Sequence, residues 1–311
     1  MNSPKHVEEV PGPFFSIPHQ DGTRFIIQVH DTAQFVALAQ TIANRGLAEK
    51  IMPSDSEWRA MRDLYLIKIH PIFPILERST LMNLPEQTDL CELIKASVCL
   101  AAATDPEAHS FMTFNRMSRQ FQPESRTNVP FDEYSHKMAS FINGRLTELQ
   151  ERNELPLVLR IRVMALTCFF WQPTHPSERF EPIRLFAQLA SLVHTHGIHL
   201  ELLARANRDR QLDAGACGSR VFKCLYALDR LLGAFTGRPV MFHNIDNMRI
   251  PRPDKQDPPG FRLFMSLIIL LDQVIELYRP NPKVSYVDVP VFERLAIDAE
   301  AQGEPEGILG M

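Results

Sequence analysis

GSRVFKCLYALDRLLGAFTGRPVMFHNIDNMRIPRP, residues 218–253, contains a helix, its end and a proline-rich continuation. The first half places apolar residues three and four positions apart, which aligns them on one face of a helix. They are Val221, Phe222, Leu225, Leu228, Leu232 and Phe235. We expect the helix to end at Gly237-Arg238-Pro239, because glycine permits a left-handed exit and proline cannot continue helical hydrogen bonding. The pattern predicts a long buried helix followed by a rigid, irregular segment.

A carboxylate interrupts this apolar face. Asp229 shares the face with Phe222 and Leu225. Burying an unpaired carboxylate costs several kcal/mol, so the position predicts a dedicated partner, for which Arg238 and Arg220 are candidates. A general base is the alternative role, but the sequence places no nucleophile beside Asp229. We therefore interpret Asp229 as one half of a structural ion pair.

The segment contains further residues at characteristic spacing. They are Arg220, Leu225, Tyr226, Leu228, Asp229, Arg230, Gly237, Arg238, Pro239, Asp246, Pro251 and Pro253. In this arrangement the segment resembles the middle homology region of fungal zinc-cluster transcription factors. YLIKIHPIFPILERSTL, residues 65–81, resembles the opening block of that region, through His70, Pro71, Phe73, Pro74, Ile75, Leu76 and Arg78. AQLASLVHTHGIH, residues 187–199, resembles one of its helix ends, through Gly197, Ile198 and His199.

The resemblance implies a transcriptional regulatory module that has no catalytic role, lies in the nucleus and contacts DNA only indirectly. As partners it implies proteins of the transcription machinery or a related zinc-cluster factor, together with a small-molecule inducer. The six-cysteine zinc cluster of the family is absent from these residues, so we expect no zinc or other cofactor in this chain. A shortened regulator, a gene-model fragment and a headless co-regulator all fit this departure from the family.

Two other classes of function stay open. One is a helical protein–protein interaction scaffold without a transcriptional role, and the other is an all-α enzyme. The glycine-rich and serine motifs of common enzyme classes do not occur in the sequence. For a small-molecule pocket we favour the apolar helix interior around Phe170, Trp171, Phe186 and Phe222.

Composition excludes several classes of partner. The chain has 311 residues, of which 45% are hydrophobic, and a net charge of −4. A negative net charge argues against a nucleic-acid-binding surface, which usually carries a basic excess. The apolar run at Leu263–Leu271 is too short to span a bilayer, and the first residues lack the apolar stretch of a signal peptide. We predict a soluble intracellular protein with no membrane partner.

Cysteine and histidine positions do not predict a metal site. The five cysteines are Cys91, Cys99, Cys168, Cys217 and Cys224, and no two of them form a C-x-x-C pair. We expect buried, reduced thiols. His194 and His196 point to different sides of a helix, and Gly197 separates both from His199. We interpret His199 as a turn residue.

Helical periodicity dominates the rest of the chain and predicts an all-α fold. We expect a multi-helix bundle or a solenoid-like array of antiparallel helix pairs, with at most one short strand near the N-terminus, at Arg24–His30. Helices are predicted at residues 31–44, 54–70, 89–103, 133–151, 156–171, 180–196 and 261–278. Ser54 and Glu57 have the spacing of a capping box, and residues 105–132 read as a long surface connection.

The predicted domain organisation has four parts. Residues 1–20 are expected to be disordered, and residues 21–57 to form an N-terminal extension. Residues 58–280 form the helical regulatory domain, and residues 281–311 a flexible C-terminal tail.

Overall fold

The computed structural model describes residues 51–84, 88–115, 126–174, 176–198, 215–243 and 250–277, with residues 215–219 as backbone, and two strands before them. Helices account for 71% of the described residues, which confirms the predicted all-α class. The chain divides into two compact units, residues 1–50 and residues 51–311. The helical unit therefore begins at Ile51, ahead of the boundary predicted at residue 58, and Ile51 is itself buried.

The N-terminal unit contains a β-hairpin. Strand β1 (Phe14–Pro18) pairs antiparallel with β2 (Arg24–Gln28), and Phe15 lies opposite Ile27. The predicted strand is confirmed at β2. Its partner, β1, lies inside residues 1–20, for which we predicted disorder from the proline-rich composition. Composition did not predict this strand, because its formation depends on pairing with β2. The helix predicted at residues 31–44 lies outside the described residues.

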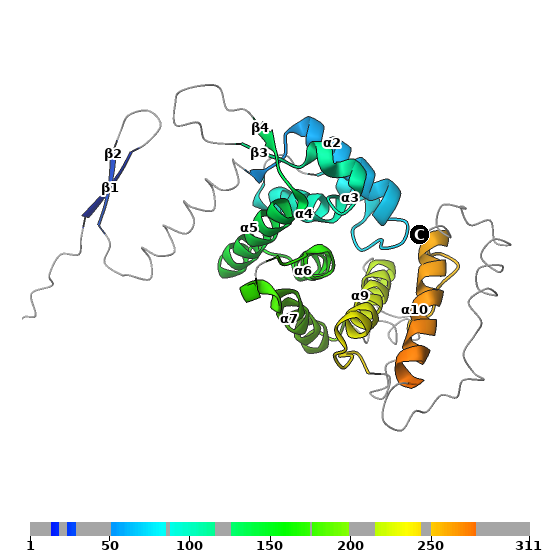
Figure 1. The fold of residues 1–311 in the computed structure, drawn as a ribbon. Helices are drawn as coiled ribbons and strands as arrows, with labels where there is room; N and C mark the ends of the chain where they lie inside the picture. The colour runs from blue at the N-terminus through cyan, green and yellow to red at the C-terminus, as the bar shows by residue number, and fades with distance from the viewer. Residues whose placement is uncertain are drawn as a thin grey trace, which may run out of the picture. The chain divides into compact units, whose positions relative to one another are not determined.

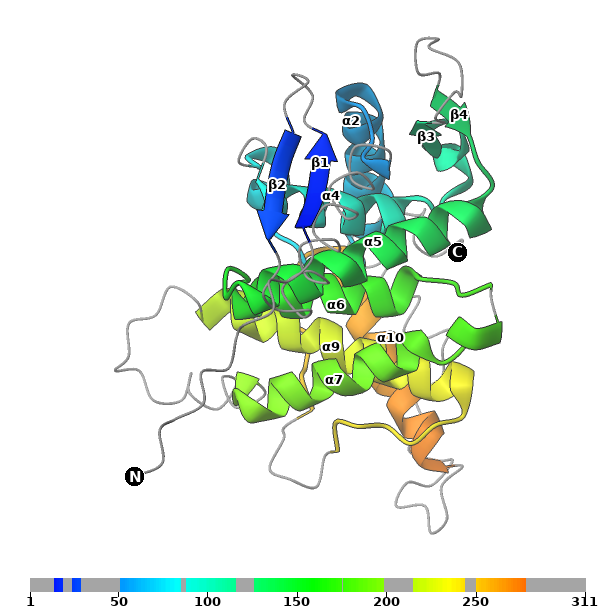
Figure 2. The same ribbon diagram turned by 90° about the vertical axis from the view of Figure 1, so that its left-hand side faces the viewer.

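The helical unit is shown in Figures 1 and 2. Its elements in chain order are α2 (Asp55–Leu64), η1 (Tyr65–Ile69), α3 (Arg78–Met82), α4 (Asp89–Ala102), η2 (Pro106–Phe111), β3 (Thr113–Asn115), β4 (Arg126–Asn128), α5 (Phe131–Glu151), α6 (Leu157–Phe170), η3 (Pro176–Glu178), α7 (Glu181–Thr195), α9 (Gly215–Thr236) and α10 (Pro259–Leu277). Seven of the eight helices predicted from the sequence, including the one that ends before Gly237, fall in the described residues, and all seven are present.

Helix α2 begins at the predicted capping box. The backbone N–H of Glu57 donates to the Ser54 hydroxyl, and the Ser54 N–H donates to the Glu57 carboxylate at 2.8 Å. The helix then widens into the π-helical turn η1, which ends before His70-Pro71 as predicted.

The connection predicted over residues 105–132 holds the second hairpin, in which β3 pairs antiparallel with β4. Arg126 on β4 pairs with Glu57 of α2 at 2.9 Å, and the Thr113 hydroxyl on β3 donates to the same carboxylate at 2.6 Å. The prediction of at most one strand was therefore wrong. The sequence does not predict β3 and β4, because each strand has three residues, too few for an alternating pattern. In addition, both strands contact Glu57, which is distant in the sequence.

Helix α6 lies at the centre of the helical unit. It packs against α4, α5, α7 and α9, and α10 packs against α9 (Figure 1). Every residue from Ile161 to Cys168 is buried, so all sides of α6 face protein. A helix in contact with four others favours a bundle over a solenoid, in which each repeat contacts its neighbours.

The four cysteines whose side chains are described, Cys91, Cys99, Cys168 and Cys224, are buried free thiols, as predicted. Burial raises the pKa of the Cys99 thiol to about 12. The side chain of Cys217 lies outside the described residues. Within the described part of the chain, no helix combines the length and apolar character needed to cross a bilayer.

Candidate functional site: the joint after helix α9

Helix α9 ends where its sequence predicts. Its last residue is Thr236, and Gly237 follows with a φ of 67°, a left-handed conformation that glycine adopts without strain. Five of the six predicted face residues are buried. The sixth, Phe235, lies in the last turn of α9 and is 76% exposed.

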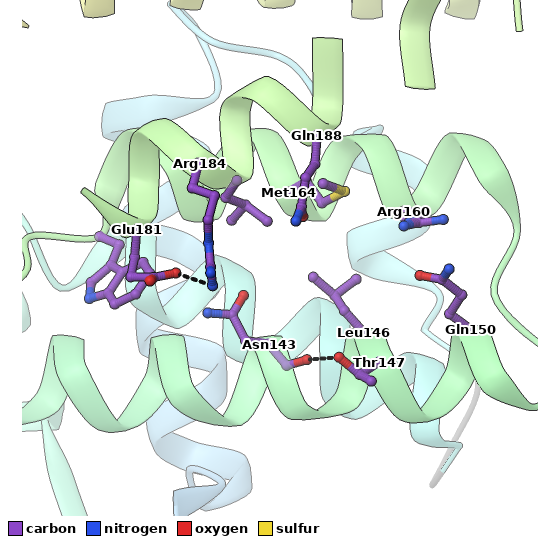
Figure 3. A pocket seen from close by; sticks show the side chains of 11 residues that line it. Asn143, Leu146, Thr147, Gln150, Arg160, Met164, Glu181, Arg184 and Gln188 are labelled. Carbon is purple, nitrogen blue, oxygen red and sulfur yellow. Dashed lines mark hydrogen bonds and ion pairs between the residues drawn. The ribbon is translucent and has the colours of Figure 1, made fainter. Parts of the chain in front are cut away.

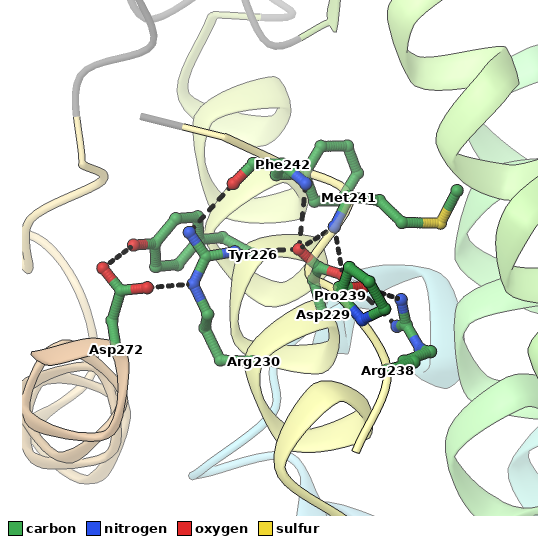
Figure 4. A network of polar contacts seen from close by, with 8 residues as sticks. All are labelled: Tyr226, Asp229, Arg230, Arg238, Pro239, Met241, Phe242 and Asp272. Atoms are coloured by element: carbon green, nitrogen blue, oxygen red, sulfur yellow. Dashed lines mark hydrogen bonds and ion pairs between the residues drawn. The ribbon is translucent and has the colours of Figure 1, made fainter. Parts of the chain in front are cut away.

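The Asp229 carboxylate is fully buried and holds the segment that follows α9 (Figure 4). It accepts hydrogen bonds from the backbone N–H groups of Met241 and Phe242, each at 2.9 Å to Oδ2. Arg238 donates to Oδ1 at 3.2 Å, and Arg230 donates to Oδ2 at 2.8 Å. We call the contacts of Asp229 and Arg230 the α9 joint.

The prediction of an ion pair between Asp229 and Arg238 is confirmed. The alternative partner, Arg220, is instead directed toward the buried carboxylate of Asp257, at 3.7 Å. The reason is chain direction: Arg220 lies more than two helical turns before Asp229, whereas the turn at Gly237 brings Arg238 back beside it. Arg238 also stacks over the Phe186 ring of α7 at 4.7 Å, which connects the joint to a third segment.

Arg230 connects α9 to α10. Its Nε donates to Asp272 on α10, and its Nη2 donates to the Phe242 carbonyl at 2.9 Å. The Tyr226 hydroxyl donates to Asp272 at 2.9 Å, and the Arg230 guanidinium lies 3.9 Å from the centre of the Tyr226 ring. Burial raises the pKa of Tyr226, so this hydroxyl stays protonated as a donor.

The geometry defines what Asp229 can do chemically. Oδ1 accepts from Arg238 and Met241, and Oδ2 accepts from Arg230, Met241 and Phe242. Both oxygens of this carboxylate are therefore already engaged by backbone N–H groups and arginines. It is not positioned to take a proton from a substrate, so the contacts favour the structural interpretation.

No protein-family model, curated protein or solved structure matches this chain. The functional interpretation therefore depends on the residues of the chain and on their contacts.

The opening block forms a separate, packed turn. The His70 ring hydrogen-bonds to the Leu76 carbonyl through Nε2 at 3.0 Å, which closes the turn. Phe73 and Pro74 are buried, Pro71 is half-buried, and the Phe73 ring lies 5.5 Å from that of Phe169 on α6. Burial lowers the pKa of His70, and the positive charges of Arg78 and Arg220 lower it further.

The other predicted family residues fall in several places. Gly197 has a φ of 65° and ends α7, as predicted. Pro251 is buried and Pro253 half-buried. His199 and Asp246 lie outside the described residues.

Sequence reasoning missed one partner of the joint, Asp272, and a second buried carboxylate that contacts α9, Asp257. Asp272 follows the apolar run at Leu263–Leu271 and is buried, and Asp257 is buried against Lys223 of α9. A charged residue in or beside an apolar stretch could have indicated Asp272, because the same pattern indicates a buried carboxylate at Asp229. The pairing itself depends on how α10 returns against α9, which local spacing does not specify.

A groove lies apart from the joint, between α5, α6 and α7. It has a volume of about 220 Å³, and Trp171 is one of its lining residues. We predicted a pocket around Phe170, Trp171, Phe186 and Phe222. Trp171 borders the groove, but Phe186 and Phe222 are buried and pack against Phe242, with ring centres 6.1 and 5.6 Å away. Among the described residues, no cluster of histidine, cysteine and acidic side chains is arranged to hold a metal ion.

Proposed function

We propose that this chain acts as the regulatory, non-DNA-contacting module of a fungal zinc-cluster-type transcription factor. The resemblance in sequence is the starting point. The observation that carries the proposal is the α9 joint, in which Arg230 and Arg238 both contact Asp229. These three residues belong to one motif of the resemblance, and their packing into one network supports a shared structural role for that motif.

The joint suits a regulatory module better than a catalytic site. Three helices meet through it: α9 supplies Asp229 and Arg230, α10 supplies Asp272, and α7 supplies the Phe186 ring under Arg238. A change in the packing of α7 or α10 is therefore coupled to the segment held by Asp229. Coupling between two packing arrangements is how a module without chemistry responds to a ligand or a partner.

The proposed partners follow from charge. A net charge of −4 does not favour direct binding to DNA, so the chain acts through proteins of the transcription machinery or a related zinc-cluster factor. We propose the nucleus as the compartment in which these contacts occur.

A tethering experiment tests the proposal. The full chain is fused to an unrelated DNA-binding domain, and expression of a reporter with the matching promoter site is measured in a fungal host. We expect expression to rise or fall relative to the DNA-binding domain alone, at equal protein level. Unchanged expression would favour the alternative, a helical interaction scaffold with no transcriptional role. Exclusion of a fluorescent fusion of the untethered chain from the nucleus would contradict the proposed compartment.

A further inference from the structure

The groove between α5, α6 and α7 combines an apolar floor with a polar rim. Leu146, Met164 and Trp171 line it and are at least nine-tenths buried. Figure 3 shows Asn143 and Leu146 of α5 pointing toward Arg184 and Gln188 of α7. Its volume of about 220 Å³ suits a compact organic molecule.

One positive charge of the rim is unbalanced. Two arginines and one acidic residue line the groove. Arg184 pairs with Glu181 at 2.6 Å, which neutralises both. Arg160 has no acidic partner among the described residues. It is half-buried, and this burial lowers the pKa of its guanidinium, which nevertheless stays charged at neutral pH.

The remaining rim groups are hydrogen-bonding side chains. The side-chain amides of Asn143, Gln150 and Gln188 line the groove, and none of these amides has a protein hydrogen-bond partner within the described part of the chain. The contact drawn at Asn143 in Figure 3 is to its backbone carbonyl, which accepts from the Thr147 hydroxyl. Each amide offers both donors and an acceptor. The groove thus presents one arginine without an acidic partner among the described residues, three side-chain amides and an apolar floor to the same small volume.

We propose that this groove binds a small organic carboxylate, with the carboxylate at Arg160 and its apolar body on Leu146 and Met164. Arginine recognises carboxylates through two parallel N–H donors, and a partly desolvated guanidinium strengthens that interaction. The amides orient the ligand. The inference concerns binding in solution and stands whether or not the chain regulates transcription.

The chain provides a built-in reporter for this site. It has two tryptophans: Trp171, which lines the groove, and Trp58, which belongs to α2 and is not one of the lining residues. The full chain labelled with 5-fluorotryptophan gives one fluorine NMR signal for each, and the Trp58→Phe variant assigns them. Benzoate is the probe, and neutral benzamide of nearly the same shape is its matched control. Inorganic phosphate tests for a general anion site.

We expect benzoate to shift the Trp171 signal saturably and to leave the Trp58 signal in place. Benzamide and phosphate should bind at least about tenfold more weakly, because one lacks the charge and the other the apolar body. Equal shifts with benzoate and benzamide would overturn the proposal, and so would a Trp171 signal that benzoate does not move. Phosphate binding as tight as that of benzoate would reduce the site to an adventitious anion contact.

A pair of charge-matched variants locates the carboxylate. Arg160→Gln should weaken benzoate binding about tenfold or more, whereas Arg59→Gln, on the exposed face of α2, should not change it. Unchanged affinity in the Arg160 variant would refute the assigned orientation. If this variant loses the native fluorine spectrum, the comparison of benzoate with benzamide on the unaltered chain still decides the proposal.

Discussion

Asp229, in α9, accepts a hydrogen bond at 2.9 Å from the backbone N–H of Phe242, which lies beyond the end of the helix. The Met241 N–H donates to the same carboxylate. A helix normally orders the chain after it through capping at its last turn. Here a side chain two helical turns inside α9 performs that role for a segment that has already reversed direction at Gly237.

Replacing Asp229 should destabilise the protein strongly. We expect Asp229→Ala to lower the free energy of unfolding by roughly 3 kcal/mol or more, because it leaves two backbone N–H donors and the buried Arg230 without this acceptor. Urea denaturation followed by circular dichroism measures the change. Asp63→Ala is the control: Asp63 is 55% exposed, and its loss should change stability by about 0.5 kcal/mol or less. A wild-type midpoint for the Asp229 variant would contradict this account of the joint.

Gly237 should be required for its backbone conformation and not for its small size. A Cβ at this position meets no atom within 4 Å, so the cost of a substitution lies in the φ of 67°. We expect Gly237→Ala to lower stability by about 1 kcal/mol, and Gly237→Asn to cost less, since asparagine tolerates left-handed geometry better. Thermal denaturation of the two variants side by side tests this. An alanine variant more stable than the asparagine variant would be inconsistent with the assigned turn.

His70 should make stability depend on pH. Burial lowers its pKa below the ordinary 6.5, so the folded protein takes up this proton less readily than the unfolded chain. Above the ordinary pKa His70 is neutral in both states, and its contribution is fully present. As the pH falls below 6.5 toward the folded-state pKa, the unfolded chain binds the proton first and stability is lost.

The His70→Gln variant isolates this effect, because glutamine keeps a donor for the Leu76 carbonyl and does not titrate. We expect the difference in unfolding free energy between wild type and variant to shift against the wild type as the pH is lowered through this window. Urea titrations at several pH values measure it. Parallel stability–pH curves would show that His70 is not protected from protonation in the folded state.

The helices and the end of α9 could be predicted because their signals are local. Apolar spacing, the Ser54–Glu57 capping box and the Gly237 turn each act within a few residues, and all are present in the structure. The pairing of Arg238 with Asp229 could also be predicted, because a buried carboxylate needs a positively charged partner and the turn at Gly237 leaves few candidates.

The parts that were missed depend on distant segments. Strand β1 needs β2, the hairpin of β3 and β4 needs Glu57, and Arg230 reaches Asp272 through the return of α10. Phe235 illustrates the same limit: its spacing matches the buried face, but whether a neighbour covers it depends on where the other helices end. The groove between α5, α6 and α7 likewise brings together residues from three helices, and its rim is polar, which a search for apolar residues does not find.

Thiol accessibility should follow burial. The four cysteines whose side chains the structure describes are buried, and burial raises the pKa values of Cys99, Cys168 and Cys224, which makes their reactive thiolate forms scarce. We expect at most one thiol per chain to react promptly with a disulfide reagent under native conditions, and all five after unfolding in urea. The absorbance released by the reagent counts them. Prompt reaction of two or more thiols in the folded protein would contradict the packing of these cysteines.

Lys223 and Asp257 should behave as an energetically coupled pair. Both side chains are 5% exposed, and the ammonium group of Lys223 donates to the Asp257 carboxylate, which also accepts the Asp254 N–H at 2.8 Å. We expect Lys223→Met to cost about 3 kcal/mol or more, because it leaves a buried carboxylate without its main counter-charge. Asp257→Asn should also destabilise, since it leaves the Lys223 ammonium buried without a carboxylate.

A double-mutant cycle measures this coupling. Once one charge has been removed, removing the other relieves an uncompensated charge, so the double variant should lose less stability than the two single losses combined, by roughly 1–3 kcal/mol. Urea denaturation of the four proteins gives the coupling energy directly. Additive losses would mean that the two groups do not interact in solution, and that the contact between α9 and the segment before α10 depends on apolar packing instead.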